Sequence, residues 1–143
     1  MADKYVDIDT LKYLLYDVHE LEKLLKRERF VDHDKESLDM FLDSSKDFAD
    51  RELFPYFKEM DENPAFHKDG QVYVHKQVET MMKKGGELGF ISSSFDYEVG
   101  GLQIPLMAST ASSYILDAAN NHLPGYAGLT QGAAELIIHF AKK

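Results

Sequence analysis

Residues 89–105 read Gly89-Phe90-Ile91-Ser92-Ser93-Ser94-Phe95-Asp96-Tyr97-Glu98-Val99-Gly100-Gly101-Leu102-Gln103-Ile104-Pro105. This stretch joins two segments with helical periodicity, and its glycines and final proline predict a long loop between them. Proline is favoured at the first position of a helix, so the next helix is expected to begin near Pro105.

On both sides of this loop, apolar residues recur every three or four positions, which predicts amphipathic helices. The predicted helices are Asp9–Lys26, Lys35–Met60, His75–Leu88, Pro105–Asn121 and, from Gly125 to Lys143, a short helix followed by another. Short connections join these segments. The sequence therefore predicts an all-α fold, a bundle of five to six mostly antiparallel helices, in a single domain over residues 1–143.

Several local signals refine the helices. Asp7 or Asp9 can cap the first helix, and Asp34 can cap the second. Pro55 lies inside the second helix, so a bend is expected near residues 51–55. Between residues 61 and 74 the chain is expected to form a connection, in which Lys68-Asp69-Gly70-Gln71 predicts a turn and Val72-Tyr73-Val74 a short extended piece.

The helical stripes also predict which side chains are buried. Along the first helix these are Ile8, Leu11, Leu14, Leu15, Val18, Leu21, Leu24 and Leu25. In the second helix, Phe41, Phe48, Tyr56 and Phe57 are assigned to the core, and Asp39, Asp43, Asp47 and Asp50 to its outer face. In later helices the predicted inward residues are Val78, Met81, Met82, Leu88, Leu129, Leu136, Ile137 and Phe140. Adjacent Gly85 and Gly86 predict close packing against a neighbouring helix.

Composition limits the classes of function. The hydrophobic fraction is 44% and the charged fraction 29%, which is typical of a globular chain. The net charge of −9 argues against partners that carry phosphate backbones, so no nucleic-acid binding is expected. There is no cysteine, which excludes disulfides and thiolate metal sites and favours a cytoplasmic protein. No apolar run approaches the roughly 20 residues that cross a bilayer, and Met1–Tyr5 lacks the pattern of a signal peptide.

Catalytic and metal-binding patterns are absent from the sequence. No nucleophile elbow surrounds the serines, and no phosphate-binding glycine loop occurs. The six histidines are dispersed, and Glu135 and His139 are the one acid–imidazole combination with helical spacing that we single out. We therefore predict no metal site and no catalytic residue in this chain.

Three glycines in the last segment stand out. Gly125, Gly128 and Gly132 are spaced to lie on one side of a helix, although each costs about 1 kcal/mol relative to alanine. Such a bare surface suits either a close crossing of two helices or the wall of a groove for an apolar ligand. Tyr97 and Tyr114 are likewise open to two interpretations, a hydroxyl presented into a cleft or an aromatic ring packed on the bundle surface.

The loop at 89–105 and the segment Pro124-Gly125-Tyr126-Ala127-Gly128-Leu129-Thr130-Gln131-Gly132-Ala133-Ala134-Glu135-Leu136-Ile137 together resemble the N-terminal domain of acyl-CoA dehydrogenases. The resemblance covers essentially the whole chain. It is closest to the long bacterial subgroup that includes methylmercaptopropionyl-CoA dehydrogenase, through Leu15-Tyr16-Asp17-Val18-His19-Glu20-Leu21.

This resemblance implies a larger flavoenzyme with a helical N-terminal domain, a middle β-domain and a C-terminal helical domain. FAD lies between the last two, where a glutamate removes the α-proton of an acyl-CoA and the flavin accepts the β-hydride. The N-terminal domain supplies one wall of the acyl pocket, which by position corresponds here to Gly125, Gly128, Leu129 and Gly132. The base and the flavin site lie outside this chain, so it is expected to be inactive alone. A homo-oligomer is expected.

Two other functions fit the same bundle. It can be a stand-alone interaction module, which predicts a gene that stops near residue 143 and a stable protein partner. It can also bind a small apolar ligand in the glycine-lined groove, which predicts thermal stabilisation of this chain by that ligand. A flavoenzyme instead predicts a much longer gene and a yellow protein.

Overall fold

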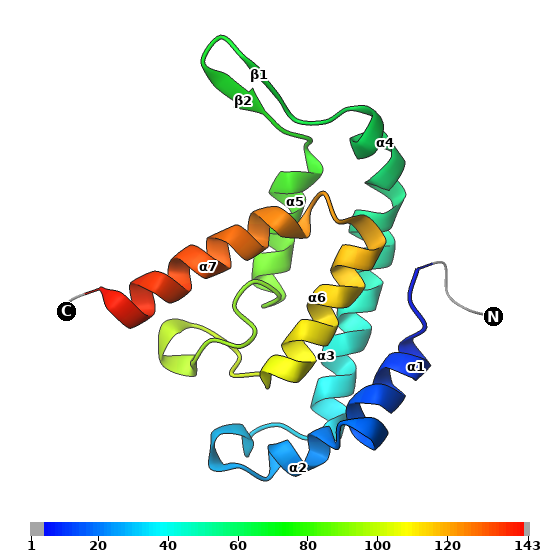
Figure 1. The fold of residues 1–143 in the computed structure, drawn as a ribbon, viewed down its shortest axis with the longest axis vertical. Helices are drawn as coiled ribbons and strands as arrows, with labels where there is room; N and C mark the ends of the chain where they lie inside the picture. Colours follow the sequence, from blue (N-terminus) through cyan, green and yellow to red (C-terminus); the bar gives the residue numbers. More distant parts are fainter. Residues whose placement is uncertain (1–4, 142–143) are drawn as a thin grey trace.

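The computed structural model describes residues 5–141, which form a helical bundle with one small protruding hairpin (Figure 1). The N-terminal elements are α1 (Ile8–Tyr13), a π-helical turn η1 (Leu14–Val18), α2 (Leu21–Leu25) and a 3-10 turn η2 (Glu28–Phe30). The central elements are α3 (Lys35–Phe48), the π-helical turn η3 (Ala49–Leu53), the 3-10 turn η4 (Phe54–Tyr56), α4 (Phe57–Glu62), β1 (Phe66–Lys68) and β2 (Gln71–Tyr73). The remaining elements are α5 (Gln77–Glu87), the 3-10 turn η5 (Tyr97–Val99), α6 (Leu106–Asn120) and α7 (Pro124–Phe140). The predicted all-α class is confirmed. None of the helices over these residues is long and apolar enough to span a bilayer.

The core is built around α3 and α6, which lie side by side (Figure 1). The buried side of α6 carries mostly small residues, which let the two backbones approach closely. The hydroxyls of Ser45 and Ser112 share a buried hydrogen bond of 2.7 Å across this contact. Farther along, the Asn120 side chain reaches the backbone of Leu53. The contacts run from 45 with 112 to 53 with 120, so α3 and α6 are parallel. The predicted, mostly antiparallel arrangement is therefore corrected for this central pair of helices.

The first predicted helix is interrupted. Asp7 caps α1 by accepting a hydrogen bond from the Thr10 amide. Of the two predicted candidates, Asp7 and Asp9, the cap is therefore Asp7. The chain then breaks at Glu20, which has a φ of 51°, so a continuous helix over residues 9–26 is wrong. The break places both Tyr16 and Leu21 in the core. No glycine or proline near Glu20 marks this break in the sequence. The burial of Tyr16 before it and of Leu21 after it is what favours the break.

Helix α1 docks antiparallel to α3 through polar contacts as well as its apolar side. Lys12 forms an ion pair of 2.8 Å with Asp43, and the Tyr16 hydroxyl donates to Asp39 at 2.9 Å. Burial, followed by the bond to Asp39, raises the pKa of the Tyr16 phenol. Two of the acids predicted on the outer face of α3 therefore bind α1. The opposite side of η1 stays open, since Leu14 and Val18 are exposed rather than buried as predicted.

The second predicted helix begins as expected and bends as expected. Asp34 and Ser37 form a capping box at the start of α3, with a 2.8 Å bond from the Ser37 amide. Around Pro55 the helix widens into η3 and then tightens into η4. The Phe57 amide, which would bond to the Leu53 carbonyl in a regular α-helix, bonds to Phe54 instead. The Leu53 carbonyl accepts a hydrogen bond of 3.0 Å from the buried side-chain amide of Asn120.

The connection after α4 is a β-hairpin that extends from the bundle (Figure 1). Asp69 and Gly70 have φ values of 51° and 77°, which is the conformation of a two-residue hairpin turn. Phe66 stacks on Tyr73 at 5.1 Å between ring centroids. The turn and the extended piece at 72–74 were predicted, whereas the partner strand β1 was not.

Some predicted core positions are corrected by the structure. Phe48 is buried, and Phe41 and Tyr56 are partly buried against the core, but Phe57 is 44% exposed beside His122. In α5, Val78 and Met81 are buried and Leu88 is exposed. Gly85 is buried, and an added Cβ would lie 3.3 Å from Met81 Cε of the same helix and 3.9 Å from Phe48 Cζ of α3, whereas Gly86 is exposed.

The loop at 89–105 folds back on itself to bring the chain to the start of α6. Gly100 has a φ of 83°, and a Cβ on Gly101 would lie 2.1 Å from the Phe95 carbonyl oxygen. The Gln103 amide donates to that same carbonyl at 2.8 Å. The buried Ser93 hydroxyl bonds to Ser109 at 2.7 Å, which fixes the loop to α6. Glycine at 101 is therefore a steric requirement of this loop.

Replacing Asn120 by alanine is expected to reduce the free energy of unfolding by about 2 kcal/mol, because the buried Leu53 carbonyl loses its donor. Urea denaturation of the chain measures this difference. Asn121→Ala at the next, exposed position serves as the control and should change stability by no more than about 0.5 kcal/mol. Equal effects of the two substitutions would contradict the role assigned to Asn120.

Candidate functional site

Helix α7 carries the residues predicted to wall an acyl pocket. It is one continuous helix of 17 residues, so the predicted short helix followed by another is wrong over the described part. It starts beside the end of α6 and crosses the bundle, contacting α5 and α6 (Figure 1). Leu123, just before the helix, and Ala127 are buried at this crossing. Gln131 and Ala134, one and two turns further along the same side, are half-buried, whereas Ile138 is exposed.

The prediction that Leu129, Leu136, Ile137 and Phe140 point inward is wrong. Their exposed fractions are 81%, 62%, 65% and 78%. The apolar pattern of α7 extends around most of its circumference, and only one narrow side meets the bundle. The C-terminal half of the helix also extends past α6 (Figure 1). The result is an apolar helix surface that no described residue covers.

The three glycines of α7 are open. Apart from the adjoining backbone of α7 itself, an added Cβ at Gly125, Gly128 or Gly132 would meet no described atom within 4 Å. A close helix crossing at these glycines, one of the two interpretations, is therefore wrong. The groove interpretation agrees with the geometry at Gly125 and Gly128, which line a depression, but not at Gly132.

Gly125 and Gly128 line a depression between α6 and α7, here called the α6–α7 depression, with a volume of about 240 Å³. Its lining consists of Met81, Phe90, Ile91, Ser113, Leu116, Asp117, Pro124, Gly125, Ala127, Gly128 and Gln131. Leu129 and Gly132 lie outside it, on the solvent side of the helix. The role of all four predicted residues in substrate binding stays a prediction.

Asp117 is the charged group of the α6–α7 depression. It lies in the last turn of α6, where the partial negative charge of the helix end disfavours an anion. Among the described residues, the structure gives its carboxylate no hydrogen bond or ion pair. Partial burial raises its pKa above the ordinary value of 3.8. The residue as a whole is nevertheless exposed, so water still reaches this carboxylate.

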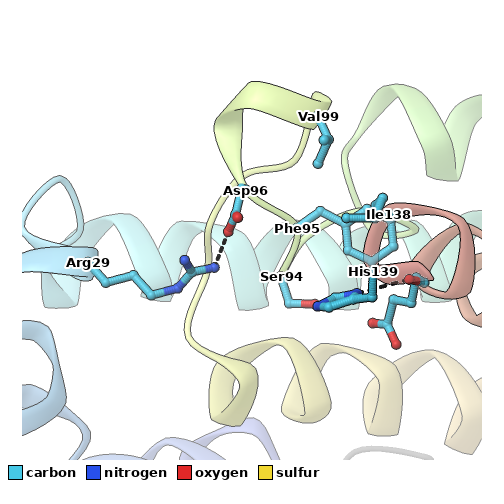
Figure 2. A pocket seen from close by; sticks show the side chains of 8 residues that line it. Arg29, Ser94, Phe95, Asp96, Val99, Ile138 and His139 are labelled. Carbon is cyan, nitrogen blue, oxygen red and sulfur yellow. Dashed lines mark hydrogen bonds and ion pairs between the residues drawn. The ribbon is translucent and has the colours of Figure 1, made fainter. Parts of the chain in front are cut away.

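A second, more polar depression lies where the loop at 89–105 meets the C-terminal end of α7 (Figure 2). It has a volume of about 260 Å³ and is lined by Arg29, Ser94, Phe95, Asp96, Val99, Glu135, Ile138 and His139. Figure 2 shows the Arg29 guanidinium reaching from the N-terminal region to the Asp96 carboxylate of the loop, with which it forms an ion pair. The positive charge of Arg29 in this depression is therefore already paired with the Asp96 carboxylate.

The Glu135 and His139 combination does not form a side-chain pair. The His139 Nδ1 atom lies 2.9 Å from the backbone carbonyl of Glu135, and since a carbonyl only accepts, Nδ1 carries the proton. The residues described contain no cluster of three or more histidine or acidic side chains arranged for a metal ion.

The two tyrosines singled out in the sequence have different surroundings. The Tyr97 hydroxyl lies 3.3 Å from His33 Nε2, which is also 3.0 Å from the Leu102 carbonyl. Tyr97 therefore links the loop to the residues before α3. Tyr114 is 53% exposed and lines an apolar depression between α1 and α6, next to Leu11 and Leu14.

Comparison with known families gives a match over residues 35–143 to the family described as acyl-CoA dehydrogenase, N-terminal domain. The match covers most of the chain and includes α3, the loop at 89–105, α6 and α7. The chain belongs to this family. The predicted family resemblance is thereby confirmed, together with the helical fold it implied.

The comparison has a clear boundary at residue 35. Residues 1–34, which contain α1 and α2, lie outside the matched range, so the long bacterial subgroup suggested by residues 15–21 stays a prediction. The comparisons with curated proteins and with solved structures gave no match to this chain.

Sequence reasoning did not find Asp117 or the pairing of Arg29 with Asp96. A signal for Asp117 was present, because it is the one charged residue among the 15 of α6. The Arg29–Asp96 pair joins positions 67 residues apart, and nothing in either local pattern connects them.

The uncovered surface of α7 predicts that the chain, taken by itself, self-associates. Burial of Leu129 and Leu136 in an association interface removes apolar side chains from water, worth about 25 cal/mol per Å². Sedimentation velocity at tens of micromolar is expected to show dimers or larger species. Replacing both leucines by glutamine should restore a monomer, whereas Val72→Gln on the hairpin should not. A wild-type chain that sediments as a clean monomer would contradict this prediction.

Proposed function

We propose that this chain is the N-terminal domain of an FAD-dependent acyl-CoA dehydrogenase, which introduces an α,β double bond into an acyl-CoA thioester. Family membership over residues 35–143 is the observation that carries the proposal. The proposal includes a cytoplasmic, homo-oligomeric enzyme, as expected from the sequence.

The flavin and the catalytic base are assigned to other parts of the enzyme. The three depressions above, and a fourth beside Phe48 that is lined by Arg51 and Lys84, have volumes of about 240 to 350 Å³. Their basic side chains, Arg29, Arg51 and Lys84, are each paired with a carboxylate of this domain. These residues do not fit the two phosphates of FAD, and no chemical step is assigned to this chain.

The role proposed for the domain is to supply part of the acyl-pocket wall and contacts to its neighbouring domains. The open glycines Gly125 and Gly128 leave space beside apolar side chains such as Phe90 and Leu116. Leu129 and Gly132 are exposed and available to the same pocket once another domain faces α7. A contiguous exposed apolar surface, such as that formed by Leu129, Leu136 and Phe140, is typical of an interaction site.

A stand-alone interaction module is the second candidate, and the exposed apolar surface of α7 favours it. In that case the surface binds another protein rather than a domain of the same enzyme. The two functions differ in one property, since only the dehydrogenase binds flavin and acyl-CoA together.

The protein encoded by the complete gene is expected to purify as a yellow flavoprotein. Adding acyl-CoA substrates of several chain lengths without oxygen should bleach its flavin absorbance, because the substrate reduces the flavin. The chain of 143 residues is expected to bind no FAD, and it serves as the control. A full-length protein without flavin, or with a flavin that no acyl-CoA reduces, would contradict the proposal.

Replacing Gly128 by leucine in the full enzyme should reduce kcat/KM for long or branched acyl-CoA substrates by about tenfold or more, because four added carbon atoms fill the α6–α7 depression. Short acyl groups should be affected less. Gly128→Ala adds little volume, and Ala133→Leu adds bulk at an exposed position away from the depression, so both serve as controls. An unchanged order of substrate preference in Gly128→Leu would contradict the wall assignment.

A further inference from the structure

The loop at 89–105 is held by a segment of the N-terminal region. Residues 28–33, here called the strap, precede the family match, whereas the loop lies within it. The Arg29 guanidinium forms an ion pair with the Asp96 carboxylate of the loop (Figure 2). In return, the Gln103 side chain donates a hydrogen bond of 2.7 Å to the Arg29 backbone carbonyl. Position 29 is therefore bound to the loop through both its side chain and its backbone.

A second contact lies four residues further along the strap, at His33. Its Nε2 atom is 3.0 Å from the Leu102 carbonyl oxygen, which only accepts, so Nε2 donates this hydrogen bond. The same nitrogen is 3.3 Å from the Tyr97 hydroxyl. The strap thus contacts the loop on both sides of the turn at Gly100, which has a φ of 83°.

One residue of the loop has a backbone conformation that needs such support. Gln103 has a φ of 51°, a left-handed conformation that residues other than glycine adopt uncommonly. Such a conformation persists where the surrounding structure fixes it. The Gln103 amide donates to the Phe95 carbonyl within the loop at 2.8 Å, and its side chain bonds to the strap at Arg29. The strap therefore helps to fix the strained residue of the loop.

The loop in turn forms one side of the proposed acyl wall. Phe90 and Ile91, at its start, line the α6–α7 depression, and Ser94 and Phe95 line the polar depression at the end of α7. The loop thus runs along α7 past both depressions. Phe90 is buried against aromatic rings of α3, so the core fixes the start of the loop. The strap contacts the loop farther on, from residue 96 to residue 103.

Resting on the proposed function, we infer that Arg29 and His33 are positioning residues, which hold the loop in the conformation that completes the acyl wall. They act on substrate binding through the loop and not on the chemical step, because the base and the flavin are assigned to other parts of the enzyme. A half-exposed ion pair contributes little by itself, so removing both contacts together is the informative change.

The test uses the full-length flavoprotein and the double variant Arg29→Met, His33→Leu. The amides of Val99, Gly101 and Gln103 bond to carbonyls within the loop, and their hydrogen exchange should become about tenfold faster, because the loop opens more easily. KM for acyl-CoA should rise about threefold or more while kcat changes by less than about twofold, the pattern of lost binding rather than lost chemistry.

Charge reversal and a matched control separate the strap from a general effect on stability. Arg29→Asp alone should speed up exchange of the loop amides, and adding Asp96→Arg should restore the slow exchange and the KM, since the ion pair is rebuilt in the opposite sense. Arg51→Met removes an arginine that pairs with Asp47, one turn earlier in the chain, and should change neither measurement. If the double variant does not fold, the charge reversal supplies the same comparison.

The outcomes are distinct. Unchanged exchange of the loop amides, or a charge reversal that fails to restore them, overturns the role of the strap. Faster exchange with an unchanged KM, or a fall in kcat without a rise in KM, overturns its role in the acyl wall and leaves the dehydrogenase proposal intact. If no acyl-CoA reduces the wild-type flavin, the proposed function and the wall role fail together, and the exchange rates still decide whether the strap holds the loop.

Discussion

The close contact between α3 and α6 is the constraint on which the rest of this structure depends. Small residues along α6 bring the two backbones together, and the buried hydroxyls of Ser45 and Ser112 satisfy each other at 2.7 Å. Because this contact is parallel, the chain must return to the start of α3 before α6 begins. The hairpin, α5 and the loop at 89–105 make that return, and Gly101 gives the loop the room to fold against itself.

The same contact determines which surfaces remain for function. One side of α6 is used by α3, so the opposite margin, with Ser113 and Asp117, faces α7. Helix α7 then crosses with only a narrow side docked, and its glycines and leucines stay open. A domain arranged this way has a complete core on one side and an unfinished apolar surface on the other. That division fits a domain that packs against other parts of a dehydrogenase.

Much of the fold could be predicted from local sequence. The caps at Asp7 and Asp34, the bend at Pro55, the turn at Asp69-Gly70 and the start of α6 after Pro105 each depend on neighbouring residues alone, and all were found. The break at Glu20 was missed because no local residue requires it. The inward positions on α7 were wrong because an apolar stripe shows that a helix can be buried, not that a neighbour covers it.

The sequence by itself determined the helical class, the caps at Asp7 and Asp34, the glycine loop and the family, since each of these is set by patterns within a few turns of chain. Tertiary structure alone decided that α3 and α6 run parallel and that Gly125 and Gly128 face a depression rather than a helix crossing. It also decided that Asp117 lines this depression, where no described residue gives its carboxylate an ion pair. The physical reason is that direction of packing, coverage and pairing are relations between distant segments, such as Arg29 and Asp96, and local periodicity contains no information about them.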